Sequence, residues 1–306
     1  MNMGEVLIKA GGFLLMILAG YVFKRTGLLK ASDANILKKI MLNLTLPCVM
    51  ICGIQNMNLQ LALIAPLIAG FLVDPLFVVY SQRLFRKRDP KMKAMAMLNL
   101  SSFNIGGFLV PFLSAFFPAS AVGISSMFDI GNGIYGTGGI FSYAQCVANP
   151  EAQFRPRDLL RNVLHSTTLM TYLPMLLLFL CGLRLPDGVY TLLRNFSSAN
   201  GFLSFFIIGL MLELHLDRED IGTVIQLLFS RYLLSVPLAA LIWFLLPVDD
   251  LVRQVLVLCL LTPFSSVTPA FCASLGCKPA LASILNALSL ILSLVVVVML
   301  LVIWQV

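Results

Sequence analysis

The sequence predicts an all-α polytopic membrane protein with ten transmembrane helices, arranged as a 5+5 inverted repeat in which broken helices 4 and 9 cross. Three observations predict this fold: an apolar composition, ten apolar stretches, and polar, proline-marked interruptions at matching places in the two halves. Of the 306 residues, 59% are hydrophobic and 11% are charged, and the mean hydropathy is +0.94. Soluble domains carry about 25% charged residues, so this chain has too little polar surface to cover a water-facing globule.

Apolar stretches of spanning length recur along the whole chain. A helix needs about 20 mostly apolar residues to cross the hydrocarbon core of a bilayer. The predicted spans are 4–24, 34–55, 59–82, 92–115, 119–147, 160–183, 188–214, 221–246, 250–275 and 279–304. Five spans on each side of a basic loop at 148–161 predict a first repeat over 1–157 and an inverted second repeat over 158–306.

Basic residues orient the predicted spans. They cluster after the first, third and fifth spans, in the runs 24–39, 83–93 and 155–161, whereas the loops at 56–60 and 116–120 carry no Lys or Arg. Cytoplasmic loops are enriched in Lys and Arg, so both termini are predicted outside the cytoplasmic membrane of a bacterial cell. The run 83–93 lies between two spans, which favours a membrane-surface loop over a nucleic-acid patch, so no nucleic-acid partner is expected.

Two interrupted spans point to a binding site. The stretch NLSSFNIGGFLVP contains Asn104, Gly106, Gly107 and Pro111, and TPFSSVTP contains Pro263, Ser265, Ser266 and Thr268. Proline breaks helical hydrogen bonding, and the freed backbone groups cannot face lipid. Paired interruptions in an inverted repeat are typical of the substrate site of a secondary transporter. The alternative is two ordinary proline kinks that the polar side chains cap.

The interruptions also predict the chemistry of the ligand. If both breaks lie near mid-membrane, two half-helix N-termini converge there with free N–H donors and partial positive charge. Such an arrangement suits a carboxylate. We therefore expect a small organic anion as substrate, with the lipid bilayer as the surrounding partner.

A carboxylate in the fifth predicted span is a candidate for ion coupling. Asp129 and Asn132 lie three residues apart, on one face of a helix. A carboxylate within a membrane is costly unless it is paired or hydrated, so it is a functional candidate. Asp129 is expected to be a proton site, and the alternative is a structural partner for the fourth-span break.

Four further polar residues are weaker candidates. Asp74, before Pro75, either takes part in coupling or caps a half-helix. Arg231 in the eighth span is either a counter-ion to an anionic substrate or a side chain that reaches toward the cytoplasmic face. Asn43 and Thr45, before Pro47, either face the cavity or support a kink.

Several function classes are disfavoured by missing motifs. The sequence contains no GxSxG, HExxH or GxxxxGKS, and its two histidines are far apart. Seven cysteines lie mostly in apolar segments without a CxxC pair. We therefore expect no enzyme activity, no metal and no cofactor, apart from H⁺ or Na⁺ as a coupling ion. Sodium would need several converging oxygens, which Asn104, Ser265, Ser266 and Thr268 could supply.

The residues resemble the auxin efflux carrier family, whose bacterial members include malonate and malate-like anion carriers. The resemblance starts in GYVFKRTGLL (20–29) and ILKKIMLNLTLPCVMICGI (36–54) and runs through almost the whole chain. Asn104 with Pro111, Asp129 with Asn132, and RYLLSVPL (231–238) are similar to patterns of its fourth, fifth and eighth spans. Pro263 with Ser265 and SILNALSLILSLVVV (283–297) are similar to its ninth and tenth. Gly106, Gly107 and Pro269 depart from the pattern expected throughout the family, and these departures leave the substrate open.

The resemblance implies a fold shared with bile-acid sodium symporters and with NhaA-like proteins. A scaffold from 1–57 and 158–216 would face a transport core from 58–150 and 217–306, and the core would move against the scaffold. Many family members are homodimers through the scaffold, so a homodimer is implied here as well. We expect secondary active or facilitative transport of a mono- or dicarboxylate. The alternatives are a sodium-coupled symporter and, from a different class, a membrane-embedded ligand sensor that does not transport.

Overall fold

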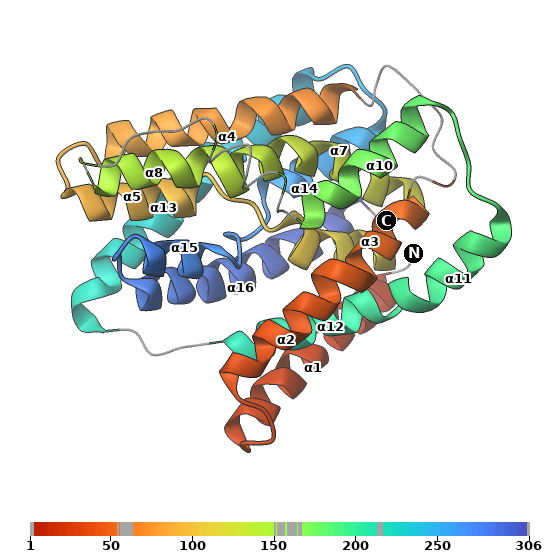
Figure 1. Ribbon diagram of the computed structural model, residues 1–306, viewed down its shortest axis with the longest axis horizontal. Helices are drawn as coiled ribbons and strands as arrows, with labels where there is room; N and C mark the ends of the chain where they lie inside the picture. The colour runs from red at the N-terminus through yellow and green to blue at the C-terminus, as the bar shows by residue number, and fades with distance from the viewer. Residues whose placement is uncertain are drawn as a thin grey trace.

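The computed structural model describes residues 3–53, 55, 64–149, 151, 157, 164, 167–212 and 217–304, and within these residues it is helical without strands (Figure 1). The all-α prediction is therefore confirmed for the described part of the chain. Its elements before the middle of the chain are α1 (Met3–Arg25), η1 (Ala31–Asp33), α2 (Ala34–Ile40), η2 (Met41–Thr45), α3 (Leu46–Gly53), α4 (Ile64–Leu84), α5 (Pro90–Leu100), η4 (Ile105–Leu109), α6 (Val110–Phe116), α7 (Ala119–Ile134), η5 (Tyr135–Gly139) and α8 (Ile140–Ala148). Those after it are α10 (Thr167–Leu180), α11 (Asp187–Ser197), α12 (Ala199–Met211), η6 (Arg218–Asp220), α13 (Ile221–Leu245), α14 (Asp250–Leu260), α15 (Thr268–Ser274) and α16 (Pro279–Trp304).

Several helices are long and apolar enough to cross a membrane. Five qualify by length and composition, and a sixth does if α5 and η4–α6, which are bent by 43°, form one span. The five are Gly4–Arg25, Ala31–Gly53, Ile64–Leu84, Arg218–Leu245 and Pro279–Trp304. Large apolar side chains on their outer faces are exposed, among them Ile8 (77%), Phe244 (78%) and Ile303 (70%). Such surfaces need lipid as their solvent, so the chain is a multi-pass helical membrane protein.

The other predicted spans correspond to shorter helical pieces. The fifth predicted span comprises α7, η5 and α8, the sixth α10, the seventh α11 and α12, and the ninth α14 and α15. Ten spans therefore stay a prediction. The loop predicted at 56–60 and most of the basic loop at 148–161 lie outside the described residues.

Two helix pairs pack at glycine contacts. A Cβ on Gly20 of α1 would lie 2.1 Å from the Phe206 carbonyl oxygen of α12, and one on Gly70 of α4 would lie 2.0 Å from the Phe128 oxygen of α7. Only a residue without a Cβ permits backbones to approach so closely. These contacts fix α1 against α12 and α4 against α7.

The helices separate into two groups with an interface between them. Helix α12 contacts both α1 and α2, and α11 contacts α3 and α12. On the other side α4 contacts α7, α5 contacts α8, α13 contacts α14, and α15 contacts α16. In Figure 1, α1, α2, α11 and α12 occupy the lower side and α4, α5 and α8 the upper side. Contacts of α3 with α7, and of α12 with α6, join the groups.

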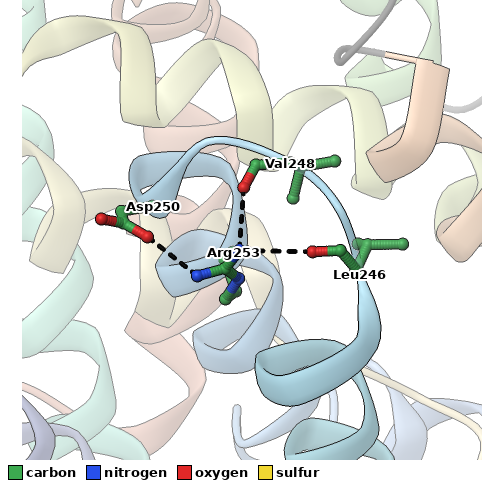
Figure 2. A network of polar contacts seen from close by, with 4 residues as sticks. All are labelled: Leu246, Val248, Asp250 and Arg253. Atoms are coloured by element: carbon green, nitrogen blue, oxygen red, sulfur yellow. Dashed lines mark hydrogen bonds and ion pairs between the residues drawn. The ribbon is translucent and has the colours of Figure 1, made fainter.

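The N-terminus of α5 and the turn before α14 are held by side chains. Asp89 caps α5 by accepting a hydrogen bond from the Met92 N–H at 3.0 Å, and Pro90 follows at the first helical position. Figure 2 shows Arg253 donating to Asp250 at 2.8 Å and to the Val248 and Leu246 carbonyl oxygens at 3.1 and 3.4 Å. These bonds tie the start of α14 to the end of α13.

Candidate functional site

The two interruptions predicted from the sequence meet in the fold. Helix α5 ends before Ser102 and helical structure resumes in η4, and a second gap separates α14 from α15. The Asn104 N–H donates to the Pro263 carbonyl oxygen at 3.1 Å. The Ser265 N–H donates to the Ser102 hydroxyl at 3.2 Å, and this hydroxyl lies 3.3 Å from the Thr268 hydroxyl. The breaks are therefore joined by backbone and side-chain hydrogen bonds.

Side chains also bind the backbone groups that the breaks release. The Arg231 guanidinium donates to the Leu100 carbonyl oxygen at the end of α5. The Phe264 N–H donates to the Ser289 hydroxyl of α16 at 3.1 Å. A helix end leaves orphan N–H and C=O groups that must find partners away from water, and here buried side chains provide them.

These bonds correct one expectation about the ligand. The convergent N–H groups were expected to be free, but those of Asn104 and Ser265 already have protein acceptors. Helix α15 has only seven residues. Among the residues that line the crossover cavity, Lys38 is the one with a cationic side chain.

A cavity lies where the breaks meet. It encloses about 940 Å³, counting the part that opens to solvent. We call it the crossover cavity; its polar lining residues are Lys38, Ser102, Asn104, Asp129, Asn132, Ser265, Ser266 and Thr268. A side cavity of about 580 Å³ adjoins it and shares Lys38, Met41, Asn104, Gly107 and Ser266 with it. Thus five of the predicted site residues with polar side chains, together with Asp129, surround one volume.

Lys38 is the cationic residue of both cavities. Its ammonium group donates to the Ser266 carbonyl oxygen at 3.1 Å, which links α2 to the second break. Neither of the ion pairs Arg253–Asp250 and Lys278–Asp220 involves Lys38, and among the described residues its ammonium group bonds to a carbonyl oxygen rather than to a carboxylate. In the sequence Lys38 belongs to the predicted cytoplasmic basic cluster 24–39, and its neighbour Lys39 gives no sign that one of the two faces inward.

Gly106 and Gly107 shape the wall of the crossover cavity. A Cβ on Gly107 would lie 2.7 Å from the Asn104 side-chain oxygen, and one on Gly106 would lie 2.9 Å from Leu46. Both glycines line the cavity. Their small size therefore holds the Asn104 side chain and Leu46 close to the backbone of the first break.

Asp129 lines the crossover cavity, and both of its carboxylate oxygens accept hydrogen bonds. The Asn132 amide and the Tyr172 hydroxyl each donate to one oxygen at 2.5 Å. Asp129 and Asn132 are 6% and 7% exposed, and they share one face of α7 as predicted. Tyr172 lies on α10 and was not predicted, because nothing in the sequence indicates that its hydroxyl meets Asp129 of a distant helix. Its bond shows that Asp129 is held by α10 rather than by the fourth-span break.

Arg231 and Asp74 lie outside both cavities. Arg231 is 1% exposed, and its guanidinium carbon lies 3.8 Å from the Phe103 ring centroid and 4.9 Å from that of Phe77. Asp74 is fully buried, and neither of its oxygens has a hydrogen-bond partner. Helix α4 continues through Pro75, so Asp74 does not cap a half-helix. Arg231 holds the break instead of facing the cavity.

Four other predicted residues also lie outside the crossover cavity. Asn43 is exposed and donates to the Lys39 carbonyl oxygen at 2.7 Å. Thr45 is 3% exposed and donates to the Asn200 side chain at 2.9 Å. Pro111 lines a third cavity of about 980 Å³, the opposite cavity, which contains none of the crossover residues. Pro263 contributes its backbone oxygen to the crossing without lining the crossover cavity.

The fold and site define a multi-pass helical membrane protein with a polar cavity at the crossing of two interrupted helices. A comparison of the chain with protein-family models finds no match, and a comparison with curated proteins finds no match either.

Proposed function

We propose that the protein is a secondary transporter or facilitator that moves a small organic anion, a mono- or dicarboxylate, across the cytoplasmic membrane. One observation carries the proposal: the crossover cavity contains Lys38, which has no carboxylate partner among the described residues. A buried or half-buried cation gains most from an anion with which it can pair and hydrogen-bond. Asn104 and the serines of the second break add neutral hydrogen-bonding groups.

The proposed architecture is ten spans in a 5+5 inverted repeat, as in the auxin efflux carrier family. Support comes from the meeting of the two breaks and from the two helix groups on either side of the cavities. In this proposal the group with α1, α2 and α12 is the scaffold, and the group with α4, α5, α7, α8 and α13–α16 moves against it. Lys38 belongs to the first group and Ser266 to the second, so the site spans the moving interface.

Asp129 is the proposed coupling residue. It borders the same cavity as Lys38, and its two donors, Asn132 and Tyr172, belong to different helices. A proton or an ion taken up there would change the charge beside the substrate. It would also change the contact between α7 and α10. Coupling to H⁺ is proposed, with Na⁺ as the competing ion.

The test begins with the purified protein in detergent. Carboxylates are screened for an increase in melting temperature, because a ligand of the native state raises stability. Compounds that stabilise are then tested for uptake into liposomes, with proton and sodium gradients imposed separately. We expect at least one small carboxylate both to stabilise and to be taken up, and the uptake to respond to the proton gradient.

The adjacent lysines supply a matched pair of variants. Lys38→Gln removes the cavity cation, whereas Lys39→Gln removes an exposed charge one residue away. Uptake should fall in the first variant and stay near the parent level in the second. A carboxylate that stabilises the parent without crossing would instead favour the ligand-sensor alternative, and equal loss in both variants would contradict a site at Lys38.

A further inference from the structure

The side cavity and the opposite cavity lie toward opposite ends of the contact between residues 41–53 and α12, two segments of the same helix group. The side cavity contains Met41 and Ser204, whereas the opposite cavity contains Val49 and Asn200. Met41 and Val49 lie on one chain segment, and Ser204 and Asn200 lie on α12. The two cavities therefore follow the same two helical segments from opposite ends.

Successive contacts connect these two segments. The Ser204 hydroxyl lies 3.2 Å from the Met41 sulfur at the side cavity. Four residues further along each segment, the Thr45 hydroxyl donates to the Asn200 side-chain oxygen at 2.9 Å. Four residues are about one helical turn, or roughly 5.4 Å. The Thr45–Asn200 contact therefore closes the last turn before the opposite cavity.

An aromatic cluster includes Phe205, the residue that follows Ser204 on α12. Phe13 stacks on Phe205 with ring centroids 4.2 Å apart, and Phe112 lies 5.1 Å from Phe13. Phe108 stacks on Phe112 at 5.9 Å. Each of the four rings is buried. A polar solute cannot pass through such a cluster without displacing the rings, whereas the Thr45–Asn200 contact is a single polar bond.

Asn200 is only partly satisfied in the closed arrangement. It is 1% exposed, and its amide nitrogen has no hydrogen-bond partner. Burying an unpaired donor is unfavourable, which offsets much of the gain from the bond with Thr45. The closed arrangement is therefore held weakly, as a gate that must open requires.

We propose that Thr45 and Asn200 form a gate between the side cavity and the opposite cavity. The gate opens when their hydrogen bond breaks and the Asn200 amide finds an acceptor in the water or the solute that enters. The gate rests on the proposed function in one respect: a solute must pass through the protein. It does not depend on which anion is carried.

Sided thiol labelling tests the gate without a substrate. The native Cys52 lines the opposite cavity and is a free thiol, and Ser204→Cys places a thiol in the side cavity. Membrane vesicles of defined orientation are treated with a small, impermeant sulfonated methanethiosulfonate. Peptide mass spectrometry then reads each cysteine separately. The side from which Cys52 reacts identifies the side to which the opposite cavity opens.

The matched pair is Thr45→Val, which removes the hydroxyl, and Thr45→Ser, which keeps it, each combined with Ser204→Cys. From the side that labels Cys52, the cysteine at 204 should react about tenfold faster with Thr45→Val, the effect of losing one hydrogen bond. Thr45→Ser should leave its rate near that of Ser204→Cys alone. If Thr45→Val does not fold, Asn200→Ala carries the same expectation.

Equal labelling at position 204 with and without the Thr45–Asn200 bond would overturn the gate. The expected labelling together with a failure of every carboxylate to enter liposomes would support the gate and reject the proposed function. Uptake of a carboxylate by the parent, together with unchanged labelling in the variants, would support the proposed function and reject the gate.

Discussion

The backbone N–H of Asn104 donates a hydrogen bond to the carbonyl oxygen of Pro263, at 3.1 Å. The bond joins two helix interruptions that lie far apart in the chain, and it leaves neither group free for a ligand. The two breaks therefore hydrogen-bond to each other. Lys38 and Asp129 supply the charged side chains that line the cavity beside them.

Ser102→Ala should destabilise the crossing. The hydroxyl of Ser102 accepts from the Ser265 N–H and contacts Thr268, and its loss leaves a partly buried N–H without an acceptor. The expected cost is about 1–3 kcal/mol in the free energy of unfolding, measured by equilibrium unfolding in detergent micelles. Ser274→Ala is the control, because Ser274 is exposed and bonds only within α15. Equal costs at the two serines would contradict this role for Ser102.

Arg231→Met should destabilise the protein by about 1–3 kcal/mol, because it leaves the Leu100 carbonyl oxygen at the end of α5 without its donor. The charge of Arg231 also acts on the buried Asp74, whose oxygens have no hydrogen-bond partner. Adding Asp74→Asn should recover part of the loss. A double-mutant cycle on unfolding free energies measures the coupling, and strictly additive effects would show that the two charges are independent.

Gly20→Ala should destabilise the pair α1–α12, whereas Gly11→Ala in the same helix should not. An added Cβ at Gly20 meets backbone atoms of Phe206, and one at Gly11 meets no atom within 4 Å. Overpacking of this kind costs about 1–3 kcal/mol, sometimes more. The melting temperatures of the two variants in detergent give the comparison, and a similar change in both would argue against close packing at Gly20.

Asp129→Asn should abolish the response of uptake to a proton gradient. The amide cannot take up a proton as a carboxylate does, although it fills nearly the same space beside Asn132 and Tyr172. Tyr172→Phe keeps the carboxylate and removes one donor, so uptake should still respond to the gradient. Both variants are measured in liposomes over a series of external pH values. Full, pH-sensitive uptake by Asp129→Asn would exclude Asp129 as the coupling site.

Local chemistry made the broken helices predictable. Glycine and proline weaken backbone hydrogen bonding locally, and a break occurs in each of the two marked stretches. The first break lies at residues 101–104, just before the helical segment that contains Gly106, Gly107 and Pro111. The pair Asp129–Asn132 followed from helical spacing in the same way.

The position of Lys38 at the crossover cavity could not be predicted from the sequence. Lys38 and Lys39 are alike in sequence, and only the packing of α2 against the second break distinguishes them. The same limit applies to Tyr172 and Asn200, whose partners come from distant helices. Arg231 was expected to be a substrate counter-ion or an interface residue, but aromatic rings enclose it, an environment that no local pattern encodes.

The most direct test of the central claim is the dissociation constant of the carboxylate that stabilises the protein most, measured for the parent, Lys38→Gln and Lys39→Gln. Loss of a charge-assisted hydrogen bond is worth about 1.5–3 kcal/mol, so Lys38→Gln should bind about tenfold to a hundredfold more weakly. Lys39→Gln should bind like the parent. Unchanged affinity in Lys38→Gln, in a protein that remains folded, would contradict an anion site at the crossing of the two broken helices.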